Sequence, residues 1–222
     1  MYSGDDMKLE SRGLLISLSP MSERDAVARI FSRDFGVLVG VMRAAVIAKK
    51  NKPLIGQLGG FVWNARLDSQ LGVFHWEAEK NIVAPILFNQ KTLACMNACF
   101  DILSNLLPER ESYADLYDDT IELMCALANG DTKAYLTWEI SLLRQLGYAL
   151  DLSKCSGCGC VNNLQYLSPR TGRAVCVTCA APYVNKLYRL PLTPTTTLCF
   201  LDSVCMQQGV RTPLMRKILK ID

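Results

Sequence analysis

Two Cys-x2-Cys pairs in the last third of the chain constrain the fold most strongly. Cys155 and Cys158 form the first pair, and Cys176 and Cys179 form the second after 17 intervening residues. This spacing is typical of a tetrahedral four-thiolate zinc site, in which each pair places two sulfur atoms on one side of a tight turn. Because these thiolates would fill all four positions of the metal, the pattern predicts one structural Zn2+ per chain, with a hairpin at residues 159–175.

The chain has six further cysteines. Cys160 could replace Cys158 as a ligand or remain a buried or free thiol, but the Cys-x2-Cys spacing on both sides favours Cys158. Cys95 and Cys99 are i,i+4 neighbours that could chelate a metal, yet core filling is favoured because cysteine is among the most buried residue types. The five cysteines that lie in apolar helical stretches are Cys95, Cys99, Cys125, Cys199 and Cys205.

The N-terminal segment MYSGDDMKLE is polar and acidic, which does not fit a signal peptide. No apolar run approaches the about 18 residues that suggest a membrane span. We therefore expect a cytoplasmic protein with no membrane partner. Thiols stay reduced in that compartment, so ten cysteines indicate metal binding or core filling rather than a disulfide framework.

Residues 9–79 contain five short runs with the alternating or β-branched pattern of strands. Turns are expected at 34–36 and 68–72, and a long basic, then Gly-rich, connection follows the third run. Five short strands with one long connection fit a small barrel, and the OB-fold is the commonest five-stranded barrel, often a binder of single strands. The predicted strands are LLISLS (14–19), AVARIF (26–31), VLVGVM (37–42), FVWNARL (61–67) and VFHWEAE (73–79).

Apolar residues recur at helical spacing from residue 82 to residue 148, and the remaining segments are shorter. Helices are expected at about 86–107, 113–128, 132–146, 196–208 and 213–219, with an irregular segment at 181–197. The predicted fold class is α+β. An N-terminal five-stranded OB-fold barrel at residues 1–80 precedes a helical domain at 81–222, which carries a four-cysteine zinc finger at about 151–182.

The net charge of +3 is unevenly distributed. Residues 1–80 carry 11 basic and 9 acidic side chains, residues 81–150 carry 4 and 9, and residues 151–222 carry 9 and 3. Two basic ends around an acidic middle suggest that the ends bind a polyanion, although each surface could simply be solvated.

Catalytic motifs are scarce in this sequence. His75 and Glu77 form an H-x-E, which zinc deaminases combine with P-C-x-x-C, but neither cysteine pair follows a proline and the H-x-E lies in a strand-like run. His75 is therefore interpreted as an ordinary strand residue. The single histidine also limits general-base catalysis. We expect a protein that is not an enzyme.

Three stretches together resemble the bacterial recombination mediator RecO family. RGLLISLSPMSERDAVARIFSRDFGVLVGVMRAA resembles the opening strands of the family, RLDSQLGVFHWEAEKN the strand pair that closes its barrel, and LQYLSPRTGRAVCVTCAAPYVNKLYRLP its zinc-finger segment. The resemblance covers roughly residues 8–190. This chain departs from the family at Ala44, where many members have glycine, and in a short tail after Pro191 that matches weakly. Many members have lost the four cysteines that this chain retains.

The resemblance implies a DNA repair protein that binds single- and double-stranded DNA and anneals complementary strands. With RecR, and in some systems RecF, such proteins help RecA replace single-strand-binding protein. A groove in the helical domain can dock the acidic C-terminal tail of single-strand-binding protein. A nucleoid-associated protein is therefore expected.

Phosphate neutralisation needs Lys and Arg, and stacking of unpaired bases needs aromatic side chains. In strands four and five, Phe61 shares a face with Trp63 and Phe74 shares a face with Trp76, where core packing is favoured over stacking. In the finger, zinc would present Arg170 and Arg173 rigidly. The candidate DNA-binding residues are Arg12, Arg24, Arg43, Lys49, Lys50, Lys52, Arg66, Arg170 and Arg173, with Arg29 and Arg33 as further barrel candidates.

Three other functions remain open from the sequence. A zinc-ribbon RNA-binding or transcription-associated module would share the charges and the cysteine pairs but would prefer RNA. A nucleic-acid enzyme would need a second metal or a catalytic site, for which the sequence offers no ligands. A pure interaction scaffold would have no nucleic-acid affinity.

Overall fold

The computed structural model describes residues 7–65, 71–148 and 150–220. The chain forms two compact units: residues 1–132 with 213–219, and residues 133–212 with 220–222. The expected domain boundary near residue 80 stays a prediction. Among the helices of the described residues, none is long and apolar enough to cross a membrane.

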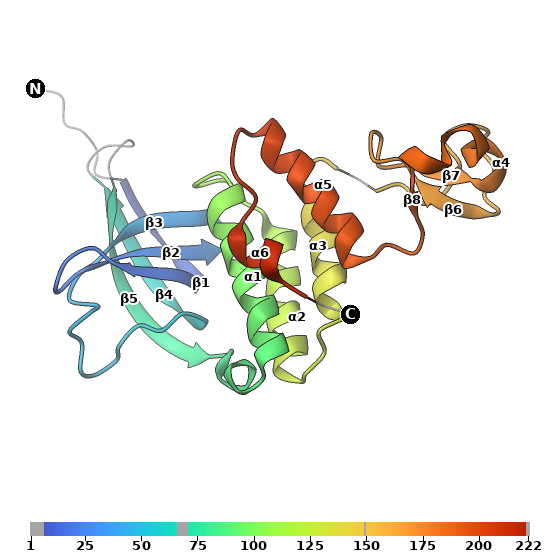
Figure 1. The fold of residues 1–222 in the computed structure, drawn as a ribbon. Coiled ribbons are helices and arrows are strands. Elements are labelled where there is room, and N and C mark those ends of the chain that lie inside the picture. Colours follow the sequence, from blue (N-terminus) through green and yellow to red (C-terminus); the bar gives the residue numbers. More distant parts are fainter. Residues whose placement is uncertain (1–6, 66–70, 149, 221–222) are drawn as a thin grey trace, which may run out of the picture. The chain divides into compact units, whose positions relative to one another are not determined.

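The first unit begins with a closed five-stranded barrel of order β1-β2-β3-β5-β4, the topology of an OB-fold (Figure 1). All neighbouring strands are antiparallel except β3 and β5. This confirms the predicted barrel. The strands are β1 (Met7–Pro20), β2 (Ala26–Ser32), β3 (Gly36–Met42), β4 (Gln57–Ala65) and β5 (Gly72–Asn81).

Strand β1 is much longer than its apolar run, because its first half pairs with β4 and its second half pairs with β2. The turn predicted at 34–36 joins β2 to β3, where Gly36 has a φ of 64° that favours glycine. Of the turn predicted at 68–72, residues 68–70 lie outside the described residues.

Aromatic side chains from β4 and β5 fill the barrel. Phe61, Trp63 and Phe74 are buried, and the Phe61 and Phe74 rings meet edge to face at 5.9 Å. The Trp63 indole Nε1 donates a hydrogen bond to the Val39 carbonyl at 3.0 Å. These three residues therefore pack in the core, as expected, and Trp76 packs against the core half-buried.

Helices of the first unit follow the barrel. Asn89 caps α1, because its side-chain oxygen accepts from the Lys91 and Thr92 amides, so the helix begins later than predicted. Cys95 and Cys99 are fully buried on α1, which confirms core filling. The Met215 amide of α6 donates to the Asp101 carboxylate of α1 at 2.9 Å. The helices are η1 (Ala84–Phe88), α1 (Gln90–Leu106), α2 (Ala114–Ala128) and α6 (Leu214–Ile218).

The second unit contains two long helices and a small three-stranded sheet of order β7-β6-β8. Helices α3 and α5 share a buried carboxylate, Glu139, which accepts from the Thr197 hydroxyl at 2.5 Å. The irregular segment predicted after residue 181 is partly wrong, because a 3-10 helix and β8 form there. The elements are α3 (Ala134–Gln145), β6 (Leu164–Leu167), β7 (Ala174–Cys176), α4 (Val177–Ala180), η2 (Ala181–Lys186), β8 (Tyr188–Arg189) and α5 (Pro194–Gln207).

Candidate metal centre and nucleic-acid interface

The β6-β7 hairpin brings the two cysteine pairs together. Cys155 and Cys158 lie in the loop before β6, Cys176 ends β7, and Cys179 lies on α4. The first pair sits on a tight turn, in which the Gly159 amide donates to the Cys155 carbonyl at 2.9 Å and Gly159 adopts a φ of 76°. The local turns and the hairpin therefore bring the sulfur atoms of the two cysteine pairs close together, as the Cys-x2-Cys spacing predicts.

The sulfur geometry fits zinc. The Sγ atoms of Cys158 and Cys176 are 3.7 Å apart. A tetrahedral site with zinc–sulfur distances of about 2.3 Å separates its sulfur atoms by about 3.8 Å. Cys155 and Cys176 are buried, and the Gly157 and Cys176 amides each donate to the Cys155 sulfur at 3.3 Å. Such amide donors stabilise a thiolate, which is the form that binds a metal.

The thiols of this cluster differ in pKa. Backbone hydrogen bonds from Cys176, Cys158 and Gly157 lower the pKa of Cys155 to about 6 against the effect of burial. The pKa of Cys160 is raised to about 12, mainly by its hydrogen bond with the Cys158 side chain and secondly by burial. Hydrogen bonds with Cys158, Cys176 and Cys155 raise the pKa of Cys179 to about 12. Without a cation, crowded sulfur atoms thus share protons rather than ionise together.

Five cysteines, rather than four, meet at this site. The ligand atoms of Cys155, Cys158, Cys160 and Cys176 all lie within 4.8 Å of one another, and Cys179 is not in this group. Cys179 nevertheless interacts with the sulfurs of Cys155, Cys158 and Cys176. Two four-sulfur sets therefore share Cys155, Cys158 and Cys176 and differ in the fourth member.

The connection between β3 and β4 carries the densest group of candidate DNA-binding residues. Arg43, Lys49, Lys50 and Lys52 are all exposed, and none forms an ion pair with the described residues. The turn before β2 lies beside this connection, because the Asp25 carboxylate accepts from the Ala44 amide at 2.8 Å. The Val46 amide also donates to the Arg24 carbonyl at 3.1 Å, which places the exposed Arg24 next to the connection.

Two other barrel arginines are already paired with carboxylates. Arg12 donates to Glu79 across the barrel surface. Arg33 forms three hydrogen bonds with the Asp118 carboxylate of α2 at 3.0–3.1 Å, and these raise the pKa of Arg33. Arg29 is half-buried on β2, and Arg66 lies outside the described residues. Pairing makes Arg12 and Arg33 weaker candidates for phosphate binding than the connection.

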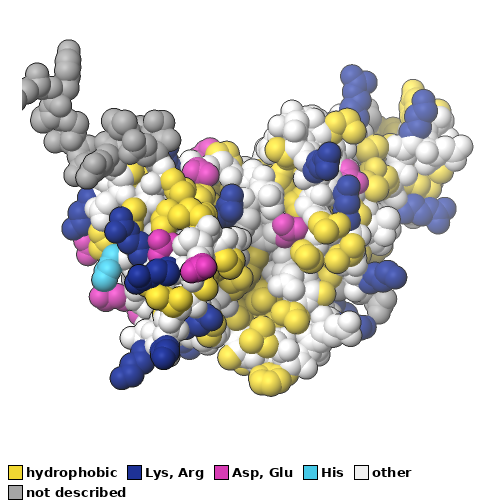
Figure 2. Space-filling view, turned by 60° about the vertical axis from the view of Figure 1, so that its left-hand side comes forward, with side chains coloured by type: hydrophobic (Ala, Val, Ile, Leu, Met, Phe, Trp, Pro, Cys, Tyr) yellow, Lys and Arg dark blue, Asp and Glu magenta, His cyan; other side chains and the backbone are white. Residues whose placement is uncertain are grey.

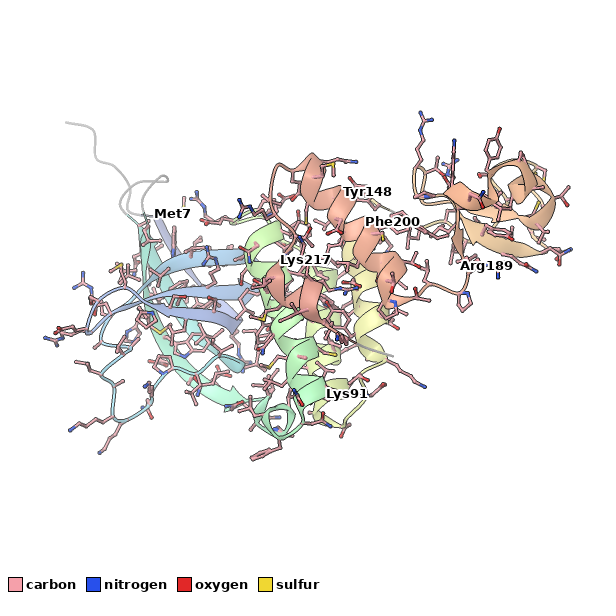
Figure 3. The ribbon with its side chains drawn as sticks, in the orientation of Figure 1. Met7, Lys91, Tyr148, Arg189, Phe200 and Lys217 are labelled. Carbon is pink, nitrogen blue, oxygen red and sulfur yellow. The ribbon has the colours of Figure 1, made fainter. Side chains whose placement is uncertain are left out.

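Two basic residues of the finger, Arg170 and Arg173, lie in the turn of the hairpin. Arg170 and Arg173 are exposed in the turn after β6, where the Ser168 amide donates to the Arg173 carbonyl at 2.9 Å. The finger contacts α5, because the Tyr188 ring meets the Phe200 ring edge to face at 5.5 Å. Figure 3 labels Phe200 on α5 and Arg189 in the finger. The hairpin thus holds Arg170 and Arg173 on ordered backbone.

Sequence patterns did not reveal a hollow on the barrel beside the basic connection. Ala48 and Asn51 of the connection line it, together with Asn64, His75 and Trp76 of the strands. His75 is thus a strand residue, as expected, but it also faces a hollow. No local signal links these positions, because only the barrel brings them together.

Comparisons with known proteins place the chain in a family. The protein-family model described as "Recombination protein O C terminal" matches residues 88–197 of this chain. "DNA repair protein RecO" of Dinoroseobacter shibae is 37% identical over 183 residues, which are 81% of this chain and 76% of the relative. The RecO protein of a Ruegeria species is 34% identical over 189 residues, which are 83% of this chain and 78% of the relative. The RecO protein of Rickettsia bellii is 31% identical over 188 residues, which are 83% of this chain and 77% of the relative. The chain therefore belongs to the RecO family.

Proposed function

We propose that this chain acts in DNA repair as a recombination mediator without catalytic turnover. It binds single- and double-stranded DNA, anneals complementary strands and, with RecR, helps to load RecA onto DNA coated by single-strand-binding protein. RecF takes part in some systems, and the tail of single-strand-binding protein docks on the helical part. Family membership supports this proposal, and the observation that carries its DNA-binding part is the exposed basic connection at residues 43–52.

Annealing is the most direct test of the whole proposal. Two complementary strands coated with single-strand-binding protein are mixed with and without this protein, and duplex formation is followed by fluorescence. Acceleration without ATP that weakens as salt rises is expected, because phosphate contacts release counterions. No acceleration by a folded, zinc-loaded sample would contradict the mediator function.

The contribution of the connection can be measured separately. Replacing Arg43, Lys49 and Lys50 with alanine is expected to lower affinity on every DNA sequence and to flatten the salt slope by about one unit per lost phosphate contact. Arg33→Ala removes a charge that Asp118 already neutralises, and this control is expected to leave the slope unchanged. An unchanged slope in the triple variant would refute the assignment of the connection.

We further propose one structural zinc per chain, held by Cys155, Cys158 and Cys176 with Cys179 as the fourth ligand. The position of Cys160 makes it the alternative fourth ligand. Cys179→Ser or Cys160→Ser alone then leaves a complete set of four thiolates, and the double variant does not. Zinc content per chain, measured in all three variants, tests this: loss of zinc in only one single variant would identify the sole fourth ligand.

A further inference from the structure

A hollow of about 390 Å3 lies between the β3–β4 connection and strand β5. Strands β3 and β5 pair at only three positions, Gly40–Met42 against Gly72–Phe74. After Met42 the chain leaves the barrel, and it returns only where β4 begins at Gln57. The connection between these residues forms no strand pairing with β5 among the described residues. Ala48 and Asn51 line one side of the hollow, and Asn64, His75 and Trp76 line the other.

The backbone around this hollow is held in an unfavourable conformation. Ala44 and Asn51, which both line it, have φ angles of 55° and 52°. Left-handed backbone costs an alanine about 1–2 kcal/mol, whereas asparagine tolerates it better. The Asp25 carboxylate holds Ala44 in place through its amide. Strain of this kind persists where the surrounding structure imposes it, and it gathers at ligand clamps.

A second unfavourable feature lies in the same wall. The Trp76 indole Nε1 is buried and has no hydrogen-bond partner among the described residues. An unsatisfied buried donor costs about 1–3 kcal/mol, and such a group in a native fold calls for an explanation. Because this nitrogen has almost no exposed surface, a ligand in the hollow can meet only the exposed part of the half-buried Trp76 ring.

The residues of the hollow match the chemistry of a nucleotide. His75 and Trp76 line it, although the His75 imidazole also lies 3.6 Å from the Glu77 carboxylate. The amides of Asn51 and Asn64 can donate to and accept from a base edge. Arg43 at the rim, with the neighbouring Lys49 and Lys50, can neutralise phosphates. Figure 2 shows Lys and Arg side chains around the histidine on this side of the barrel, interspersed with Asp and Glu. A volume of about 390 Å3 lies within the range of small-ligand sites.

We propose that this hollow binds one unpaired nucleobase of single-stranded DNA, with the flanking phosphates on the β3–β4 connection. This inference rests on the proposed DNA binding and adds a reason for preferring single strands, because a base in a duplex is stacked and cannot enter. A second hollow of about 360 Å3 on the barrel is a poorer site. Glu10 and Glu77 line it, and Arg12, which also lines it, is already paired with Glu79.

Filling the hollow tests this proposal. Ala48→Leu adds a bulky side chain to its wall without changing charge, and Ala78→Leu makes the same change at an exposed position of β5 that lines neither hollow. Each protein is titrated with single-stranded and double-stranded DNA over a range of salt. Ala48→Leu is expected to weaken single-strand binding about 5- to 150-fold, the equivalent of about 1–3 kcal/mol for one stacked base. Its duplex affinity and salt slope are expected to match those of the Ala78→Leu control.

His75→Ala provides a second variant, because His75 is exposed and its loss does not disturb the core. A 2-aminopurine base in the single strand is expected to lose fluorescence on binding the parent protein and to lose less with either variant. Parent-like single-strand affinity in both variants would overturn the pocket and leave the proposed function intact. No DNA binding by the parent would overturn both. Tighter binding of an RNA strand of the same sequence would overturn the choice of DNA.

Discussion

The barrel and the finger present basic side chains by different physical means. The barrel core contains eleven buried residues, among them Phe61, Trp63 and Phe74. The finger core contains only five, and two of these are Cys155 and Cys176. An apolar cluster of that size cannot offset the entropy of ordering about forty residues, whereas a bound metal can. The comparison predicts that the finger loses its order without a bound metal, whereas the barrel needs none.

Removal of the metal should produce the largest effect. Cys176→Ser is expected to abolish zinc binding and hydrogen-exchange protection across residues 155–189, because structural zinc contributes about 10–16 kcal/mol to the folding of small fingers. Protection of the barrel strands is expected to persist. Cys125→Ser, at an exposed cysteine outside the cluster, serves as the control. A finger that stays protected without zinc would remove the contrast between the two regions.

A substitution that leaves a cavity in the barrel core tests whether the barrel depends on its apolar packing. Trp63→Ala removes a buried ring and its hydrogen bond to Val39, so the free energy of unfolding should fall by about 3–5 kcal/mol. Chemical denaturation measures this change, and zinc content should stay at one per chain. Val62→Ala, at the half-buried neighbouring position, should cost far less. Loss of zinc from Trp63→Ala would show that the finger depends on the barrel.

A smaller effect, an increase in the free energy of unfolding, is expected from a substitution at Ala44 in the β3–β4 connection. Ala44→Gly removes a left-handed alanine, which costs about 1–2 kcal/mol, and adds the chain entropy of glycine, about 0.5–1 kcal/mol. The free energy of unfolding should therefore rise by up to about 1.5 kcal/mol. Ala45→Gly, at the buried neighbour, should lower it. A decrease with Ala44→Gly would mean that the alanine methyl makes contacts that outweigh the strain.

The smallest predicted effect concerns Asp151 at the base of the finger. Hydrogen bonds from the Ser153 hydroxyl and amide lower the pKa of Asp151. The carboxylate therefore stabilises the finger above its unfolded pKa of about 4, and this contribution is lost as pH falls through the lower folded value. An NMR titration should show the Asp151 pKa rising in Ser153→Ala. An unchanged pKa would mean that the amide alone holds the carboxylate.

Local patterns predicted much of the fold. The strand periodicity and turn residues indicated all five barrel strands, and the helical spacing indicated the long helices, because each depends on neighbours in sequence. The start of α1 was misplaced because the Asn89 cap overrides the apolar pattern before it. The short η2 and β8 were missed because β8 forms only against β6.

By itself, the sequence determined the order of the elements and predicted the zinc-binding chemistry, since turns, periodicity and Cys-x2-Cys spacing act over a few residues. The tertiary structure decided which basic side chains remain available. Arg33 pairs with Asp118 across 85 residues, and Arg12 pairs with Glu79 across 67. It also brought Cys160 beside the expected ligands and opened the hollow between the connection and β5. These features depend on barrel closure and hairpin pairing, which join residues that no local pattern connects.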